Sequence, residues 1–102
     1  MISSIFQAAG IPNRETRWAN PPEETYAIYF DDVTADGSDY RPLKLRHDCM
    51  VELYEDKPDP ESEYALETAI TNAGLEWVKQ ARYWLKDIKK YQVVYEFTYY
   101  EK

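Results

Sequence analysis

The stretch DCMVELYEDKPDPESEYALETAITNAG, residues 48–74, decides the fold, because it encodes a strand that turns directly into a helix. At its start the side chains alternate between two faces: Cys49, Val51 and Leu53 fall on one side, and Met50, Glu52 and Tyr54 on the other. A period of two is typical of a half-buried strand. The strand is expected to stop before Pro58, because proline cannot donate a hydrogen bond to a neighbouring strand.

The remainder of this stretch predicts a helix with clear ends. Asp59 is a good N-cap, since its carboxylate can accept hydrogen bonds from the first turn, and Pro60 fits the first helical position. Gly74 is placed to end the helix in a left-handed conformation. The helix has one apolar stripe, formed by Leu66, Ala69, Ile70 and Ala73.

The composition indicates a single folded domain over residues 1–102. Hydrophobic residues make up 44% of the 102 residues, enough for one modest core. Ten tyrosines against three phenylalanines favour sheet surfaces and contact faces over a dry interior. The apolar runs are too short for a transmembrane helix. Residues 1–3 lack a signal-peptide pattern, so the protein is expected to stay inside the cell that makes it, without membrane association.

Charge and cysteine content exclude several classes of function. Nineteen acidic residues against twelve basic ones give a formal net charge of −7, which argues against specific nucleic-acid binding. We expect this acidity to serve solubility. The one cysteine, Cys49, excludes an intramolecular disulfide and a metal site with several thiolates.

The N-terminal segment predicts a short helix and a polar connection. Ser3 or Ser4 can cap the helix, and Gly10 is expected to end it. Residues 13–20 are polar except for Trp18, and Pro21-Pro22 is expected to force an extended entry into the next element.

A strand is predicted over residues 25–30, where Tyr26, Ile28 and Phe30 alternate with Ala27 and Tyr29. Residues 31–39 contain four aspartates and Gly37, which indicates a solvated connection. The partner strand is expected to begin between residues 40 and 45 and to run through Cys49 to Tyr54.

Residues 75–88 allow two interpretations. Trp77, Val78, Ala81, Trp84, Leu85 and Ile88 fit a helical stripe, and periodicity alone favours the helix. The alternative is a strand over residues 75–83, followed by a tight polar turn through Lys86 to Lys90. The last element is a strand with an aromatic face, made by Tyr91, Val93, Tyr95, Phe97 and Tyr99. Together the patterns predict an α+β domain with a mostly antiparallel sheet of about four strands and two helices, in the order α-β-β-α-β-β.

No constellation of residues indicates catalysis, and we expect no enzyme activity, cofactor or metal. His47 is the one histidine, and at the head of a strand it is expected at the surface or a sheet edge. His47 and Cys49 share a strand face, but no third residue is in place to orient a nucleophile pair, and Cys49 fits the core. The spacing of Asp31, Asp32, Asp36 and Asp39 lacks the pattern of a calcium loop. The three glycines stand singly, so there is no phosphate-binding loop.

Several motifs together are similar to one known family. VELYEDKPDPE (residues 51–61) resembles an "ELYTDKKDPE" signature, and KKYQVVYEF (residues 89–97) is similar to the family's "lYQViYEi" ending. Gly-Ile-Pro at residues 10–12, Pro-Pro at residues 21–22 and TADGSDY at residues 34–40 follow the family's order. The family is that of small tail-terminator or head–tail joining proteins from phages and prophages of Gram-positive bacteria.

This resemblance implies an α+β fold and a ring, usually hexameric, that ends tail-tube growth and contacts the neck. The implied partners are other copies of the chain, the tail-tube protein and a neck or head-completion protein. The protein would assemble in the cytoplasm of the bacterial host and then join the tail or neck of the virion. The resemblance also favours the strand over residues 75–83, although ARYWLKDI at residues 81–88 departs from the family's polar "YIESE".

A ring subunit needs two unlike contact faces on each protomer. The candidate contact residues are Tyr95, Tyr99, Tyr100, Trp84, Asp36 and Asp39, with the aspartates facing a lumen. The alternative function is an acidic phage-encoded binding protein, either a DNA mimic or an inhibitor of a host nucleic-acid enzyme. A mimic should align its carboxylates at phosphate-like spacing, whereas here the acids gather in loops and at a helix start.

Overall fold

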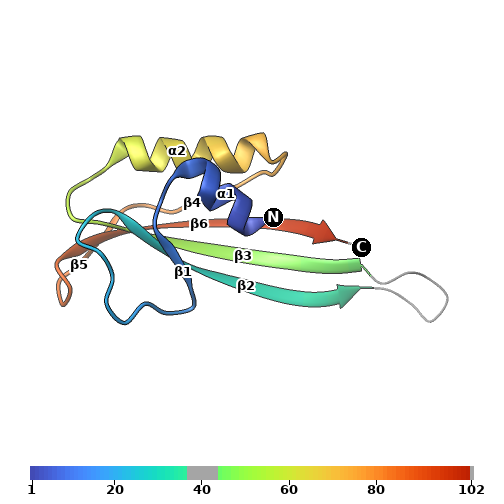
Figure 1. Cartoon of the computed structure of the whole chain (residues 1–102), viewed down its shortest axis with the longest axis horizontal. Coiled ribbons are helices and arrows are strands. Elements are labelled where there is room, and N and C mark those ends of the chain that lie inside the picture. Colours follow the sequence, from blue (N-terminus) through green and yellow to red (C-terminus); the bar gives the residue numbers. More distant parts are fainter. Residues whose placement is uncertain (37–43, 102) are drawn as a thin grey trace.

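The computed structural model describes residues 1–36 and 44–101, and within them a six-stranded sheet lies under two helices (Figure 1). The sheet order is β1-β2-β3-β6-β4, and β5 also pairs with β6. The pairing of β1 with β2 is parallel and the others are antiparallel. The expected α+β class is confirmed. The elements follow the chain as α1 (Ile2–Ala9), β1 (Asn13–Glu15), β2 (Tyr26–Asp36), β3 (Lys44–Glu55), α2 (Pro60–Asn72), β4 (Val78–Lys79), β5 (Tyr83–Leu85) and β6 (Lys90–Glu101).

Helix α1 ends as predicted but begins differently. Gly10 has φ 70°, and its N–H donates to the carbonyl of Phe6. The expected serine cap is wrong: the N-cap is Met1, which makes no side-chain capping bond. Ser4 Oγ instead donates to the Met1 carbonyl at 2.7 Å. The buried side of α1 is formed by Ile2, Ile5 and Phe6.

The polar segment after α1 contains a strand that the sequence did not predict. β1 pairs in parallel with residues 27–29 of β2, and the Ala27 N–H donates to the Pro12 carbonyl at 2.8 Å. Ile11 is buried in the core and holds the backbone that follows it against this edge of the sheet. Because β1 is only three residues long, it leaves no hydrophobic pattern.

Strand β2 is longer than predicted. It continues past Phe30 to Asp36, so Asp31 and Asp32 are strand residues and do not belong to a solvated connection. Both are in register with β3, where Asp31 lies opposite Cys49 and Asp32 opposite Asp48. Residues 40–43, where the partner strand was expected to begin, lie outside the described residues, and β3 is described from residue 44.

Helix α2 agrees with the prediction at both ends. The Asp59 carboxylate accepts hydrogen bonds from the backbone N–H of Ser62 at 3.1 Å and from Thr25 Oγ1 at 2.6 Å. Gly74 follows the helix with φ 82°. The Asp59 cap therefore joins the start of α2 to the residue that precedes β2.

The helix favoured by periodicity for residues 77–88 is wrong. This segment forms the two short strands β4 and β5, which pair with β6, and residues 86–89 form the polar turn of the alternative. The expected single strand over residues 75–83 is interrupted after Lys79. Of the expected apolar stripe, Trp77 packs against the core, whereas Val78, Trp84 and Ile88 are exposed.

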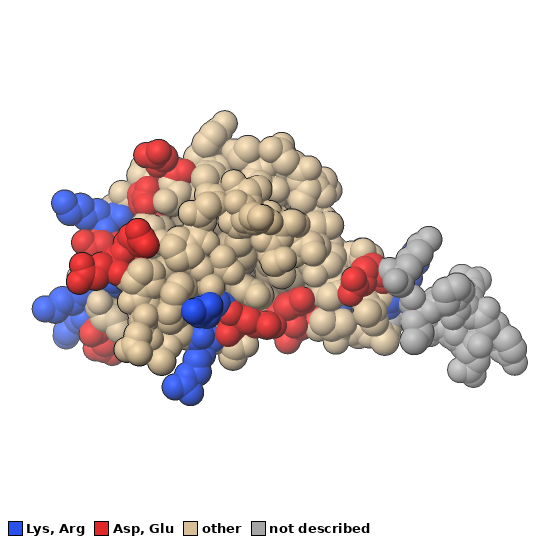
Figure 2. Space-filling view, viewed as in Figure 1, with Lys and Arg blue, Asp and Glu red and all other residues tan. Residues whose placement is uncertain are grey.

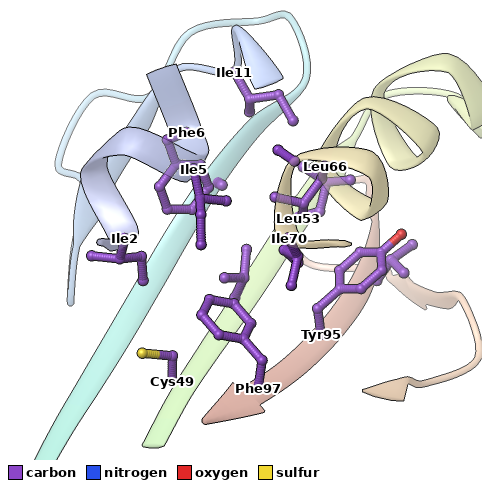
Figure 3. Packing of buried hydrophobic residues seen from close by; sticks show 14 of the residues in the cluster. Ile2, Ile5, Phe6, Ile11, Cys49, Leu53, Leu66, Ile70, Tyr95 and Phe97 are labelled. Atoms are coloured by element: carbon purple, nitrogen blue, oxygen red, sulfur yellow. The ribbon is translucent and has the colours of Figure 1, made fainter. Parts of the chain in front are cut away.

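One hydrophobic cluster joins both helices to the same face of the sheet (Figure 3). α1 contributes Phe6, and α2 contributes Leu66 and Ile70, which pack over β3 and β6. The sheet side of the cluster is formed by Ala27, Cys49, Val51, Leu53, Val93, Tyr95, Phe97 and Tyr99. Cys49, Val51 and Leu53 therefore form the inward face of β3.

We expect Ile70→Ala to lower the free energy of unfolding by about 2–5 kcal/mol, because Ile70 is fully buried and its loss leaves a cavity. The matched control on the same helix is Tyr64→Ala, since Tyr64 is 70% exposed and its loss should cost under about 0.5 kcal/mol. Urea denaturation of both variants measures the difference. Equal midpoints for the two variants would contradict the packing of α2.

Candidate functional site

No helix of the described chain covers the second face of the sheet (Figure 1). Side chains alternate between faces along a strand, so residues next to the buried ones in β2, β3 and β6 point away from the helices. Cross-strand neighbours on this face form the rows Ile28–Glu52–Val94 and Phe30–Met50–Glu96. The open face therefore combines apolar side chains with carboxylates.

A groove of about 980 Å³ lies at the border of this face, beside β6 and the segment that joins α2 to β4. Its apolar lining includes Phe30, Met50, Leu75, Trp77, Val78 and Phe97. Its acidic lining consists of Asp32, Asp48, Glu52, Glu76 and Glu96. No lysine or arginine of the described chain lines this acidic groove.

One wall of the acidic groove is fixed against α2. Trp77 Nε1 donates to Thr71 Oγ1 at 3.0 Å, and the Trp77 ring packs edge-on against the ring of Tyr95 with centroids 5.9 Å apart. The N–H of Leu75 donates to the carbonyl of Ile70 at 3.3 Å. The wall is therefore held in place by the helix.

The sheet has unpaired strand edges at the end away from β5. β4 pairs with β6 only at residues 95–96, so residues 97–101 of β6 have no described strand beside them on that side. β1 likewise ends beside residue 29 of β2 and leaves residues 30–36 without a described outer neighbour. Free strand edges carry unpaired backbone groups and are places where another chain can pair.

A buried pair of acidic residues joins β3 to α2. Glu55 and Glu63 are both buried, and Arg82 contacts both: Nε donates to Glu55 Oε1 at 3.3 Å and Nη2 to Glu63 Oε2 at 2.6 Å. Lys79 Nζ lies 2.8 Å from a carboxylate oxygen of Glu63 and of Glu67. These ion pairs hold the segment that carries β4 and β5 against α2.

The chemistry of this pair indicates that Glu55 holds a proton. Burial, followed by the neighbouring Glu63 carboxylate, raises the pKa of Glu55 to about 8. Within the described chain, Oε2 of Glu55 is buried without a hydrogen-bond partner. A proton on that oxygen leaves the buried group uncharged, which lowers the cost of its burial. Glu63 keeps a pKa below its usual value: burial opposes this, but hydrogen bonds from Glu55, Lys79 and Arg82 outweigh it.

His47 is buried and joins three strands, so its expected position at the surface is wrong. Nδ1 lies 2.8 Å from Asp31 Oδ1 on β2, and Nε2 lies 2.6 Å from Glu101 Oε1 on β6. Carboxylates only accept, so the ring can donate to both of them at once only as an imidazolium. Burial alone would lower the pKa of His47, but the hydrogen bonds to both carboxylates outweigh it and raise the pKa. The ring also stacks on Tyr99, with centroids 4.3 Å apart.

This arrangement does not form a nucleophile pair. Both nitrogens of His47 are occupied by carboxylates, so neither can take a proton from Cys49. Burial first, and then the Asp31 charge, raises the pKa of the Cys49 thiol to about 12. Within the described residues, no three side chains of His, Cys, Asp or Glu form a group that could hold a metal ion. None of the described helices has the length and apolar character needed to cross a membrane.

The structure separates the candidate contact residues of the sequence analysis. Tyr95 and Tyr99 are buried on the side of the sheet that faces the helices. Tyr100 is 60% exposed on the open face and Trp84 is 48% exposed on β5. Asp36 ends β2, but nothing is described of its side chain, and Asp39 lies outside the described residues.

The acidic groove was not predicted from the sequence. A signal was present, because Val94, Glu96 and Thr98 alternate with the aromatic residues of β6 and so had to share the other face. The wall at residues 74–78 could not be predicted, since its position depends on how the chain returns from α2 to β6. Figure 2 shows that charged side chains gather at the β5 end and along the lower edge of the view, whereas α1 carries none.

Comparison with known proteins gives likeness to solved structures. No family model and no curated protein sequence matches this chain. A chain from the solved structure "Virion of native gene transfer agent (GTA) particle" is similar in fold, with a TM-score of 0.57 and 16% sequence identity. The alignment covers 92% of this chain and 81% of that one. At this identity the likeness concerns the fold.

We expect the NMR titration of His47 to have its midpoint above the usual histidine value of about 6.5. The chain has one histidine, so the imidazole signals report this residue alone. The pKa of His47 is raised in the folded state above its value in the unfolded state. The stability that His47 contributes is therefore fully present below the unfolded pKa, and it is lost as the pH rises through the folded pKa. In His47→Gln, this loss of stability with rising pH should be absent. In Asp31→Asn, the titration midpoint of His47 should be lower than in the wild type. A midpoint at or below about 6.5 would contradict the two hydrogen bonds to carboxylates.

Glu55 should make the protein less stable as the pH rises from 4.5 through about 8, the range over which its pKa is raised. The folded state holds this proton more tightly than the unfolded state, so the contribution is present at low pH and is lost in that range. Glu55→Gln keeps the size and hydrogen bonds of the neutral acid, and its stability should fall less. Urea denaturation at several pH values compares the two in a His47→Gln background. Parallel profiles would show that Glu55 is ionised throughout.

Proposed function

We propose that this chain is a structural subunit of a phage-like particle, a tail terminator or head–tail joining protein that forms a ring. The observation that carries this proposal is the likeness of fold, over 92% of the chain, to a chain of a gene transfer agent virion. The proposed partners are other copies of the chain, a tail-tube protein and a neck or head-completion protein. Assembly would take place in the cytoplasm of the bacterial host.

The motifs that resemble the terminator family lie at the centre of the fold. Residues 51–61 form the end of β3, the turn and the start of α2, and residues 89–97 lead into and form most of β6. β3 and β6 pair with each other over eleven positions from Leu45–Glu101 to Glu55–Tyr91. Two motifs far apart in sequence therefore meet in one pair of strands, which supports a shared fold.

The described surface offers unlike faces at opposite ends of the sheet, as a closed ring requires. At the β5 end, Tyr83, Trp84 and Ile88 are 66%, 48% and 50% exposed. At the other end, Val33 on β2 and Tyr100 on β6 are exposed. We propose the β5 patch, defined as Tyr83, Trp84 and Ile88, as one of the two ring contacts, because one short strand and the turn after it expose three large apolar side chains.

The DNA-mimic alternative finds less support. In the row Phe30–Met50–Glu96, two of the three side chains are apolar, and in the row Ile28–Glu52–Val94 the acid lies between aliphatic residues. Apolar side chains that interrupt the carboxylates favour contact with protein over imitation of a phosphate backbone.

The experiment is removal of the gene from a strain that produces particles, followed by electron microscopy. We expect tails of abnormal length or tails separated from heads, and restoration by the wild-type gene on a plasmid. Trp84→Ser should fail to restore normal particles while its circular dichroism stays unchanged. The matched control is Tyr64→Ser on α2, since Tyr64 is 70% exposed and far in sequence from the β5 patch.

Normal particles without the gene would refute the structural role. If the wild type restores particles and Trp84→Ser restores them equally well, the role stands and the β5 patch is not a ring contact.

A further inference from the structure

We propose that the acidic groove binds an extended segment of a separate protein, in which apolar side chains alternate with lysine or arginine, and that this segment pairs with β6. The inference goes beyond the proposed function and does not depend on ring formation. It rests on the backbone edge, the apolar lining and the charge of the acidic groove.

The backbone of β6 is ready to accept another strand. The N–H of Gln80 donates to the carbonyl of Val94 at 2.9 Å, so the even-numbered residues of β6 direct their backbone groups away from β3. Beyond β4, these groups belong to Thr98 and Tyr100, and no described strand pairs with them. Thr98 lines the acidic groove, so a strand paired there would lie in it.

The lining of the acidic groove suits apolar side chains at intervals. Trp77 and Leu75 form its wall, and Val78 is 61% exposed beside them. Phe97, on the helix side of β6, continues this apolar surface. An extended segment directs alternate side chains to one side, so every second residue can reach this surface.

The charge of the acidic groove determines the remaining positions of the segment. Five carboxylates line it, and only Asp48 has a described lysine or arginine within ion-pair distance, Arg46 at 3.0 Å. Complementary charge across an interface selects the partner and speeds association. A lysine or arginine next to each apolar residue would point to the open face, where Asp32, Asp48, Glu52 and Glu96 lie, and would neutralise these carboxylates.

A second copy of this chain is a poor occupant. Its free strand edge on β2 carries the exposed Asp32, and the free edge of its β6 lies beside its own Glu96. Either edge would bring further acids to the acidic groove, and like charges placed opposite each other are unfavourable. The chemistry therefore indicates a different, basic partner.

The test uses the full chain and an acetylated, amidated peptide of sequence KVKIKVT, with EVEIEVT as the charge-reversed control. Binding is measured by fluorescence anisotropy of labelled peptides and by NMR shifts of Thr98, Tyr100 and Trp77. We expect the basic peptide to bind at least about tenfold more tightly than the acidic one, and its affinity to fall as salt is added.

Two sets of variants test the backbone and the charge components of the proposal. Thr98→Pro removes the outward backbone N–H and should weaken binding about fivefold to tenfold, because one backbone hydrogen bond is lost. Its matched control is Thr98→Ala, which also loses the hydrogen bond from Thr98 Oγ1 to Asp48 but keeps the backbone donor, and should bind like the wild type. Glu76→Lys combined with Glu96→Lys should reverse the preference for the basic peptide, and both residues are exposed enough to leave the fold intact.

Equal binding of the two peptides, or no binding of either, would overturn the proposal. Equal binding by Thr98→Pro and Thr98→Ala would overturn pairing with β6. If the wild type self-associates in light scattering, Thr98→Pro abolishes that association and neither peptide binds, the occupant is a second copy.

Discussion

The structure depends on the pairing of β3 along its whole length on both sides. β3 is in register with β2 from Lys44 to Tyr54 and with β6 from Leu45 to Glu55. This register directs Cys49, Val51 and Leu53 toward the helices and leaves Met50 and Glu52 on the open face. A slip of one residue would exchange the two faces and bury acidic side chains under the helices. The burial of apolar residues on the helix side therefore also determines which side chains lie on the open face. The acidic groove follows from the same register.

Long, continuous patterns were the features of the fold that the sequence could predict. The alternation around Val51, the Asp59 cap and the aromatic face of β6 each depend on neighbours in the chain, and the structure has all three. β1 could not be predicted, because its three residues pair through backbone atoms alone. The helix expected over residues 77–88 was wrong, although the apolar residues of this segment have helical spacing. Ion pairs of Lys79 and Arg82 with α2 hold the segment as short strands beside β6.

The candidate sites were harder to predict than the fold, since each is formed by residues distant in sequence. His47 has a carboxylate from β2 on one side and one from β6 on the other, which no local pattern around residue 47 indicates. The acidic groove needs residues from β2, β3, β6 and the segment after α2. The sequence could predict which side chains share a face of one strand, but not which strands are neighbours.

Cys49 offers a natural probe of how the two layers separate. Its thiol lies beneath α1 and is 3% exposed, and a pKa of about 12 leaves almost no thiolate near neutral pH (Figure 3). A thiol reagent can therefore react only after the helix layer has lifted from this region of the sheet, since the thiolate is the reactive form. With no other cysteine in the chain, the rate of labelling counts these opening events directly. The native protein thus reports its own local unfolding without any engineered label.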